Sequence, residues 1–190
     1  MTYVDDAHGE GVLGGGAGIG KHFNIHGQID VEMGTFSKAF GVVGGLAAGS
    51  TDLKNYALNK SRTWLLSGSH PPAVAGAQLE AIRVLQEEPE HNQRLWDNTN
   101  YFKKEMGSMG FNTGHTETPI VPVITGPSDL AVKLSDGLWE EGVYALPIVF
   151  PMVARDAARI RNMMNAGHTK EDLDTAIAAY EKVGRSLGII

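Results

Sequence analysis

The sequence has no cysteine among its 190 residues, which excludes disulfide bonds, thiolate catalysis and cysteine-ligated zinc sites. It has no apolar run long enough to span a membrane, and no basic region followed by an apolar stretch marks a secretory signal at its start. Basic residues are too few for a general nucleic-acid or anionic-membrane surface, since the net charge is −6. These absences predict a globular protein of the cytoplasm that binds neither nucleic acid nor membrane.

Glycine is abundant, with 24 residues, many of them before Ser50. Seven of the twelve positions from Gly9 to Gly20 are glycine, so this segment is not expected to hold a regular element. The hydrophobic content of 42% and the charged content of 20% are ordinary for a globular domain. The amino-terminal part is therefore expected to consist of tight loops between short strands.

Strands and helices are expected to alternate along the whole chain. We expect strands at residues 2–4, 30–35, 42–48, 63–66, 120–124, 143–146 and 159–163. We expect helices at 52–61 with Thr51 as cap, between Pro71 and Pro89, from there to about 109, at 128–141 with Ser128 as cap, and after a capping box at 169–172. The natural division is near 88, which predicts an α/β part over 1–88 and a small α+β domain over 89–190.

Two carboxylates and an imidazole follow the first expected strand. Asp5, Asp6 and His8 stand where that strand ends and a loop begins, which is where open α/β sheets bind ligands. An aspartate there can make a charge-assisted hydrogen bond to a protonated ring nitrogen, and His8 can reach another edge of the same ligand. The alternative is a solvated pair of aspartates at the start of a loop.

A lysine follows the second strand, within the segment Gly34–Gly41. We expect Lys38 to be partly desolvated among small, hydroxyl and aromatic residues, and desolvation favours the neutral amine that Schiff-base chemistry requires. Thr35 and Ser37 offer hydroxyls suited to a phosphate. The alternative is a surface lysine in a turn.

The two segments together indicate one kind of ligand. An acid of the protein must contact one end of this ligand. The ligand itself must carry a phosphate at its other end and an aldehyde between the two. Pyridoxal 5'-phosphate has these features, and an aspartate beside its pyridine nitrogen keeps the ring an electron sink. The sequence therefore predicts a pyridoxal-phosphate enzyme without a metal.

The paired motif resembles that of the α-oxoamine synthases. The similarity extends over nearly the whole chain, through Ser67–Pro72, Phe150-Pro151, Ala158–Arg161 and Ala166–His168. It implies the carboxyl-terminal half of a fold-type I pyridoxal-phosphate transferase, an α/β protein, with residues 1–88 as part of the cofactor-binding large domain. The sequence departs from the family pattern at Gly68, Ala154, Asn165 and Gly167.

The resemblance also implies roles for individual residues. Lys38 holds the cofactor covalently and moves the α-proton, Asp5 pairs with the pyridine nitrogen, and His8 bonds the ring hydroxyl. Thr35 contacts the phosphate. Ser67 or Ser69 supplies a further phosphate contact across a dimer interface.

The substrates follow from the same resemblance. Arg161 matches the arginine that binds the amino-acid carboxylate, for which a planar guanidinium is well suited. The family condenses a small amino acid with an acyl-CoA to give a β-keto amino acid, with decarboxylation in some members. The carboxyl-terminal stretch most resembles glycine C-acetyltransferases, so glycine is favoured. The alternatives are an 8-amino-7-oxononanoate synthase or serine palmitoyltransferase type, a fold-type I aminotransferase and an inactive partner subunit.

The family's members are about twice as long as this chain. We therefore expect a homodimer with shared active sites. We also expect little activity from this chain alone, unless a separate amino-terminal half is supplied. Two other signals are given less weight. Gly15–Lys21 nearly matches a nucleotide phosphate loop, but His22 replaces its Ser or Thr. His8, His22 and His26 lack the spacing of a metal site.

Overall fold

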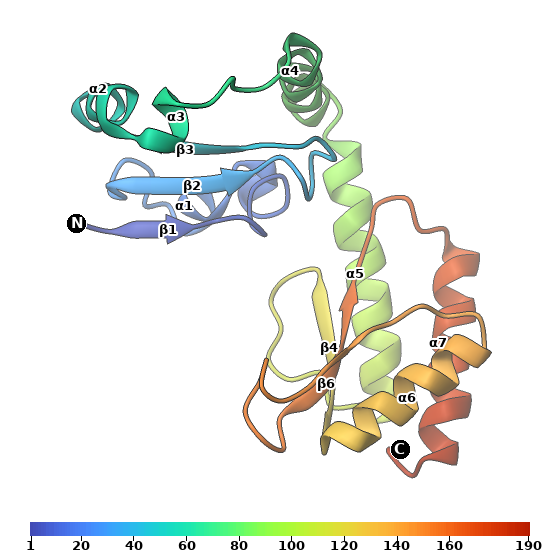
Figure 1. Cartoon of the computed structure of the whole chain (residues 1–190). Coiled ribbons are helices and arrows are strands. Elements are labelled where there is room, and N and C mark those ends of the chain that lie inside the picture. The colour runs from blue at the N-terminus through green and yellow to red at the C-terminus, as the bar shows by residue number, and fades with distance from the viewer. The chain divides into compact units, whose positions relative to one another are not determined.

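The computed structural model describes all 190 residues, which form two compact units, Met1–Asn92 and Gln93–Ile190 (Figure 1). Each unit contains its own three-stranded sheet. No helix is both long enough and apolar enough to cross a bilayer.

The sheet of the first unit has the order β1-β2-β3. Its strands are β1 (Tyr3–Asp5), β2 (Val31–Thr35) and β3 (Gly45–Gly49), close to the expected segments. β1 runs parallel to β2, whereas β3 is antiparallel to it. The carboxyl ends of β1 and β2 therefore lie at the same edge of the sheet.

The glycine-rich connection between β1 and β2 holds two short helical turns, η1 (Gly14–Gly16) and α1 (Ile19–His22). The expectation of no regular element was thus wrong for these few residues. Gly15 lies inside η1 with a φ of +68°, a conformation that glycine adopts without steric cost. The turns are short because glycine lacks the side chains that would hold a longer helix by packing.

Three helices follow β3. In α2 (Thr51–Lys60) the cap is Ser50, one residue before the expected Thr51, and its hydroxyl accepts a hydrogen bond from Leu53 N at 3.2 Å. The expected strand at 63–66 is wrong, because these residues belong to α3 (Arg62–Leu65) and the turn that ends it. Pro72 opens α4 (Pro72–Glu87) as expected, and α5 (Glu90–Met109) follows Pro89.

The sheet of the second unit is antiparallel, with the order β4-β6-β5. β4 (Ile120–Gly126) is an edge strand, which suits Pro122 because proline has no N–H for a second neighbouring strand. β6 (Ala158–Met163) is central. The strand expected at 143–146 is instead β5 (Pro147–Ile148).

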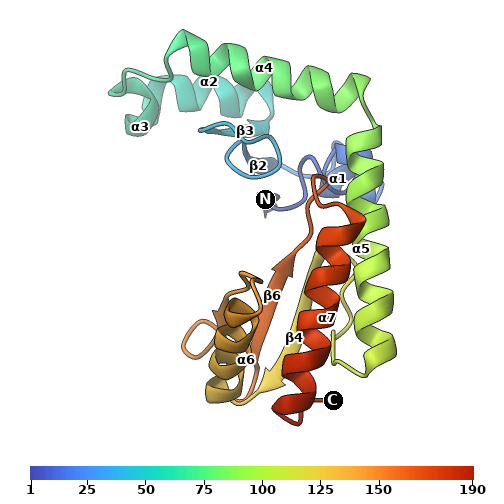
Figure 2. The ribbon, with the colours of Figure 1, turned by 90° about the vertical axis from the view of Figure 1, so that its right-hand side faces the viewer.

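Two helices of this unit lie along the sheet, α6 (Ser128–Glu140) and α7 (Lys170–Ser186) (Figure 2). The N-cap of α6 is Pro127, so the expected cap at Ser128 was wrong by one residue. The capping box before α7 is confirmed. Asp172 N donates to Thr169 Oγ1 at 3.1 Å, and Thr169 N donates to Asp172 Oδ2 at 2.9 Å.

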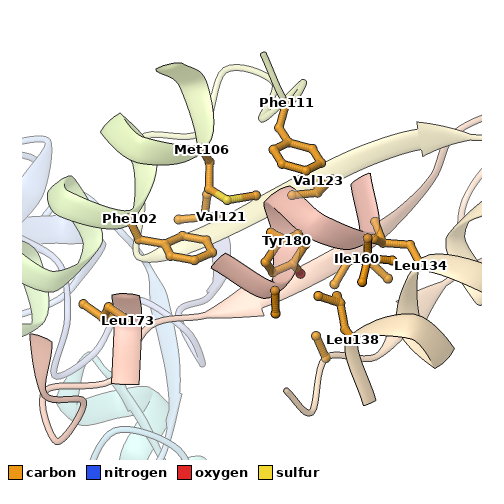
Figure 3. Packing of buried hydrophobic residues seen from close by; sticks show 13 residues of the cluster. Phe102, Met106, Phe111, Val121, Val123, Leu134, Leu138, Ile160, Leu173 and Tyr180 are labelled. Carbon is orange, nitrogen blue, oxygen red and sulfur yellow. The ribbon is translucent and has the colours of Figure 1, made fainter. Parts of the chain in front are cut away.

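The apolar core lies in the second unit. Phe102, Met106, Leu134, Ile160 and Tyr180 are almost fully buried in one cluster, which Figure 3 shows between the helices and the sheet. In the first unit, by contrast, the buried hydrophobic side chains are those of Leu13, Val31 and Phe36. The first unit therefore holds its shape more through loops and strand pairing than through a core.

Candidate active site

An acid and a hydroxyl lie at the carboxyl edge of the first sheet. Asp5 ends β1, Thr35 ends β2, and Asp5 is paired with Met33. Side chains alternate between the two faces of a strand, and paired residues point to the same face. Asp5, Met33 and Thr35 thus share one face. This is the edge at which open α/β sheets bind ligands.

The two aspartates of the sequence motif point to different surroundings. Asp5 is exposed, and its Oδ1 accepts a hydrogen bond from Ala7 N at 3.1 Å. Asp6 is buried, and its Oδ2 accepts one from Ile19 N at 2.8 Å. His8 is exposed in the turn that follows. Asp5 is accordingly the aspartate available to a ligand on the open face, and it is the one to which the family resemblance assigned the pyridine nitrogen.

β3 leaves that face unobstructed beside Thr35. Gly45 is the partner of Thr35, and Ala47 is the partner of Met33. Both side chains are small or absent. A flat ring could therefore approach the sheet at this point without meeting a bulky group from β3.

Lys38 lies in the turn between β2 and β3. The turn is closed by Phe36 N donating to Gly44 O at 3.0 Å and by Val42 N donating to Phe36 O at 2.8 Å. Thr35 Oγ1 donates to Gly44 O at 3.1 Å and lies 2.8 Å from Ser37 Oγ. Two hydroxyls are thus held in the segment that leads to the lysine.

The Lys38 side chain is exposed, so the expected partial desolvation is wrong for this chain. The aromatic residues beside it explain the difference. The ring of Phe36 is buried and packs against that of Phe40, with 5.2 Å between the centroids. The two rings form the base of the turn and do not cover the amine.

The segment with Ser67 and Ser69 is exposed and follows α3. Ser69 N donates to Ser67 Oγ at 3.1 Å, and Ser69 adopts a φ of +60°, which is rare outside glycine. A Cβ built on Gly44 would lie 3.0 Å from His70 Nε2. This segment therefore passes close to the base of the Lys38 turn.

Arg161 belongs to the second unit, on the central strand β6. Its side chain is exposed, whereas its neighbours Ile160 and Asn162 are buried, as alternation along a strand requires. Arg161 lines a cavity of about 660 Å³ together with residues of the 142–148 segment, α7 and His168. A buried nitrogen, Nδ1 of His168, has no hydrogen-bond partner there.

The structure does not support a nucleotide phosphate loop at Gly15–Lys21 or a metal site at the three histidines of the glycine-rich segment. In the loop that resembles a phosphate loop, the carboxylate of Asp6 already accepts the N–H of Ile19 at the start of α1. The one group of potential metal ligands is Glu88, Glu90 and His91, not the three histidines of the glycine-rich segment. His91 Nε2 lies 2.9 Å from Glu88 Oε2 on the surface.

Comparison with known families supplies the observation that decides the family. The model of the family described as "Aminotransferase class I and II" matches residues 1–179. The chain belongs to the class I and II aminotransferase family. Within this family its relatives are α-oxoamine synthases, so the resemblance seen in the motifs is confirmed.

Two curated relatives illustrate the similarity of this aminotransferase-family chain. One is an 8-amino-7-oxononanoate synthase of Symbiobacterium thermophilum, 54% identical over 191 residues. Another is an 8-amino-7-oxononanoate synthase/2-amino-3-ketobutyrate coenzyme A ligase of Thermus thermophilus, 53% identical over 192 residues. Each match covers 100% of this chain and 49% of the relative. The chain thus spans about half the length of the curated relatives it matches.

Solved structures confirm the predicted fold class. A serine palmitoyltransferase with pyridoxal phosphate superposes with a TM-score of 0.94 at 29% identity, over 100% of this chain and 48% of that one. An 8-amino-7-oxononanoate synthase of Francisella tularensis has a TM-score of 0.83 at 22% identity, over 99% and 56%. The cofactor predicted from the motifs is the one bound in the first of these structures.

Proposed function

We propose that this chain carries the cofactor lysine and part of the substrate site of a pyridoxal-phosphate-dependent acyltransferase, which joins a small amino acid to an acyl-CoA. The observation that carries the proposal is the sharing of one sheet edge by Asp5 and Thr35, with Lys38 in the turn that follows. The names of its relatives, which include synthases and an acyltransferase, support the reaction class.

The donor groups at this edge fit pyridoxal phosphate. An exposed carboxylate, two hydroxyls and an exposed primary amine lie around a face that Gly45 and Ala47 leave open. When bound, the cofactor supplies an aldehyde for the amine and a ring that withdraws electrons from the substrate's α-carbon. A carboxylate, a phosphate-binding hydroxyl and an amine are the three kinds of group that such a ligand requires.

Each residue at the edge has a proposed task. Asp5 holds a proton at the pyridine nitrogen through a charge-assisted hydrogen bond. His8 donates to or accepts from the ring hydroxyl. Thr35 donates to the phosphate, as does Ser67 or Ser69 of a second copy in a homodimer. Lys38 Nζ would be the amine that holds the cofactor through its aldehyde, and the same amine would move the proton of the substrate's α-carbon.

Arg161 is the proposed carboxylate-binding residue for the amino acid. Its guanidinium is exposed on β6 and lines the cavity of the second unit. The planar fork of an arginine can bind both oxygens of a carboxylate and so fix the orientation of the α-carbon. We therefore assign residues 1–88 to cofactor binding and residues 89–190 to a small domain that binds substrate.

Among the members of the family, an 8-amino-7-oxononanoate synthase type is favoured, because curated proteins 51–54% identical to this chain carry that name. A glycine C-acetyltransferase type is the second candidate. It is supported by the Thermus thermophilus relative, whose name includes 2-amino-3-ketobutyrate coenzyme A ligase. Amino acid and acyl-CoA are the substrates in both cases.

The test is covalent trapping of the cofactor on the purified chain. Pyridoxal phosphate is added, the imine is reduced with borohydride, and the modified peptide is located by mass spectrometry. We expect the label on Lys38, its loss in K38A and its retention in K54A, a matched change of an exposed lysine in α2. Because the chain spans half of its relatives' length, we expect weak binding that needs excess cofactor.

Labelling that spreads evenly over the lysines, or that persists in K38A, would contradict the proposal. The reaction class is tested on the same protein by adding glycine, alanine or serine and then acetyl-CoA or longer thioesters. Release of CoA supports an acyltransferase. Turnover of a keto acid without any thioester would instead identify an aminotransferase.

A further inference from the structure

Asp6 has no role in the proposed cofactor site, yet its carboxylate and its backbone both make hydrogen bonds within the first unit. Its side chain is only 8% exposed, and Oδ2 accepts a hydrogen bond from Ile19 N at 2.8 Å. Its backbone N donates to Met33 O at 2.8 Å, and its backbone O accepts from Gly9 N at 2.9 Å. This one residue therefore joins β2, the turn after β1 and the start of α1.

Two glycines enclose the Asp6 carboxylate. A Cβ built on Gly9 would overlap Oδ1, and one built on Gly18 would overlap Oδ2. Gly18 also has a φ of +85°, a conformation that favours glycine. The glycine-rich segment thus closes around this carboxylate, which explains why glycine stands at these two positions.

The contacts of Asp6 bear on its neighbours in the sequence. Asp5 precedes it and His8 lies two residues further on, and both are assigned to the cofactor. The Asp5 carboxylate is itself held by Ala7 N at 3.1 Å, inside the turn that Asp6 anchors. Asp6 points away from the open face, because side chains alternate at the end of β1.

We propose that Asp6 is a positioning residue for the cofactor site. By binding Ile19 N between Gly9 and Gly18, it fixes the turn that carries the Asp5 carboxylate and the His8 ring. It acts through this turn and does not touch the cofactor. The inference rests on the proposed function for its effect on pyridoxal phosphate, but its effect on the turn exists without any ligand.

The experiment compares D6A and D6N in the full chain, with D136A as a control at an exposed aspartate of α6. Amide hydrogen exchange is measured by NMR at Ile19 and Ala7, together with the cofactor concentration that half-saturates trapping on Lys38. Loss of one charge-assisted hydrogen bond predicts about a tenfold higher half-saturating concentration for D6A. Exchange is expected to accelerate at both amides.

D6N retains an oxygen that can accept the Ile19 N–H, so we expect it to stay close to the wild type in both measurements. If D6A quickens exchange at Ile19 but leaves Ala7 and cofactor trapping unchanged, Asp6 is merely structural. If D6N impairs trapping while Ile19 exchange stays normal, the charge of Asp6 acts on the cofactor directly. Either result would overturn the inference.

Failure of the proposed function gives a different pattern, because wild-type chain would then show no preference for labelling Lys38. The Ala7 comparison still decides the positioning role in that case. If D6A does not fold, I19P decides the role, because proline at the first position of α1 removes the N–H that Asp6 accepts. Quickened exchange at Ala7 together with weaker trapping on Lys38 supports the role, and unchanged exchange at Ala7 with normal trapping refutes it.

Discussion

Glu10 is an acid in an unfavourable position. Its Oε2 is buried without a hydrogen-bond partner, and its carboxylate lies where a Cβ on Gly34 would be. Burial raises the pKa of Glu10 above its ordinary value of 4.5, and the nearby charges of Asp6 and Glu32 raise it further. The folded chain therefore binds the proton of the Glu10 carboxyl more tightly than the unfolded chain does. The free energy of unfolding falls as the pH rises from the ordinary pKa of 4.5 through the raised pKa of the folded state.

We predict that E10Q stabilises the protein at neutral pH by about 1 kcal/mol, the low end for an unpaired polar group, since the side chain is only partly buried. The gain should vanish at pH values below 4.5, where the glutamate is protonated in both states. Urea unfolding of E10Q and wild type at both pH values measures this. E140Q, at an exposed glutamate of α6, is the control. An equal gain at low pH would refute the electrostatic explanation.

At the same scale, the sequence was informative about residue types but not about their surroundings. The family resemblance already assigned Asp5 to the pyridine nitrogen, and the structure adds that Asp5 is exposed at the sheet edge whereas Asp6 is buried. The sequence did not predict the exposure of Lys38, because the aromatic rings of Phe36 and Phe40 pack on each other instead of on the amine. It named Asp6 only as one of two acids at a strand end, because the burial of this carboxylate between Gly9 and Gly18 comes from the folded loop.

At the scale of elements, the helices that were predicted well have residues in the sequence that mark where they start. Prolines mark the starts of α4 and α5, and the Thr169–Asp172 box marks α7. Short apolar runs were predicted poorly. Residues 63–66 were expected to form a strand but lie in and just after α3, since four apolar residues have no period that separates a strand from a helical turn.

The capping box yields an element-scale prediction. We expect T169A to destabilise the second unit by about 1 kcal/mol, because the N–H of Asp172 loses its side-chain acceptor. T175A removes the same atoms from an exposed site inside α7, where alanine favours the helix, so it should cost nothing. Urea unfolding followed by circular dichroism compares the two. Equal losses would show that the cap contributes nothing.

The cap should also depend on pH. Hydrogen bonds from the backbone N–H of Thr169 and, to a smaller extent, from its side chain hold the pKa of Asp172 below its ordinary value. A lowered folded-state pKa means that this contribution is present at neutral pH and is lost as the pH falls through that lowered pKa. T169A keeps this N–H and removes only the hydroxyl. The difference in unfolding free energy between T169A and wild type should therefore narrow in acid only by the contribution of the hydroxyl.

At the scale of the whole molecule, the apolar core is unevenly divided. The large buried cluster consists of residues from the second unit, from Phe102 to Val183. The first unit exposes large apolar side chains instead, among them Trp64 at 60%, Leu66 at 80% and Leu79 at 70%. Hydrophobic burial is the main favourable term in folding, so the two units are expected to differ in stability.

We predict that the units respond separately to a core mutation. Leu134 is fully buried in α6, and L134A should cost the second unit about 2–5 kcal/mol through the cavity it creates. L79A, the same change at an exposed site of α4, should alter stability by less than about 0.5 kcal/mol. Hydrogen exchange measured by mass spectrometry in increasing urea resolves peptides from each unit. Faster exchange in L134A should be confined to residues 93–190, with residues 1–92 exchanging at the lower urea concentration in every variant. One shared transition, shifted throughout the chain by L134A, would show instead that the molecule unfolds as a single cooperative body.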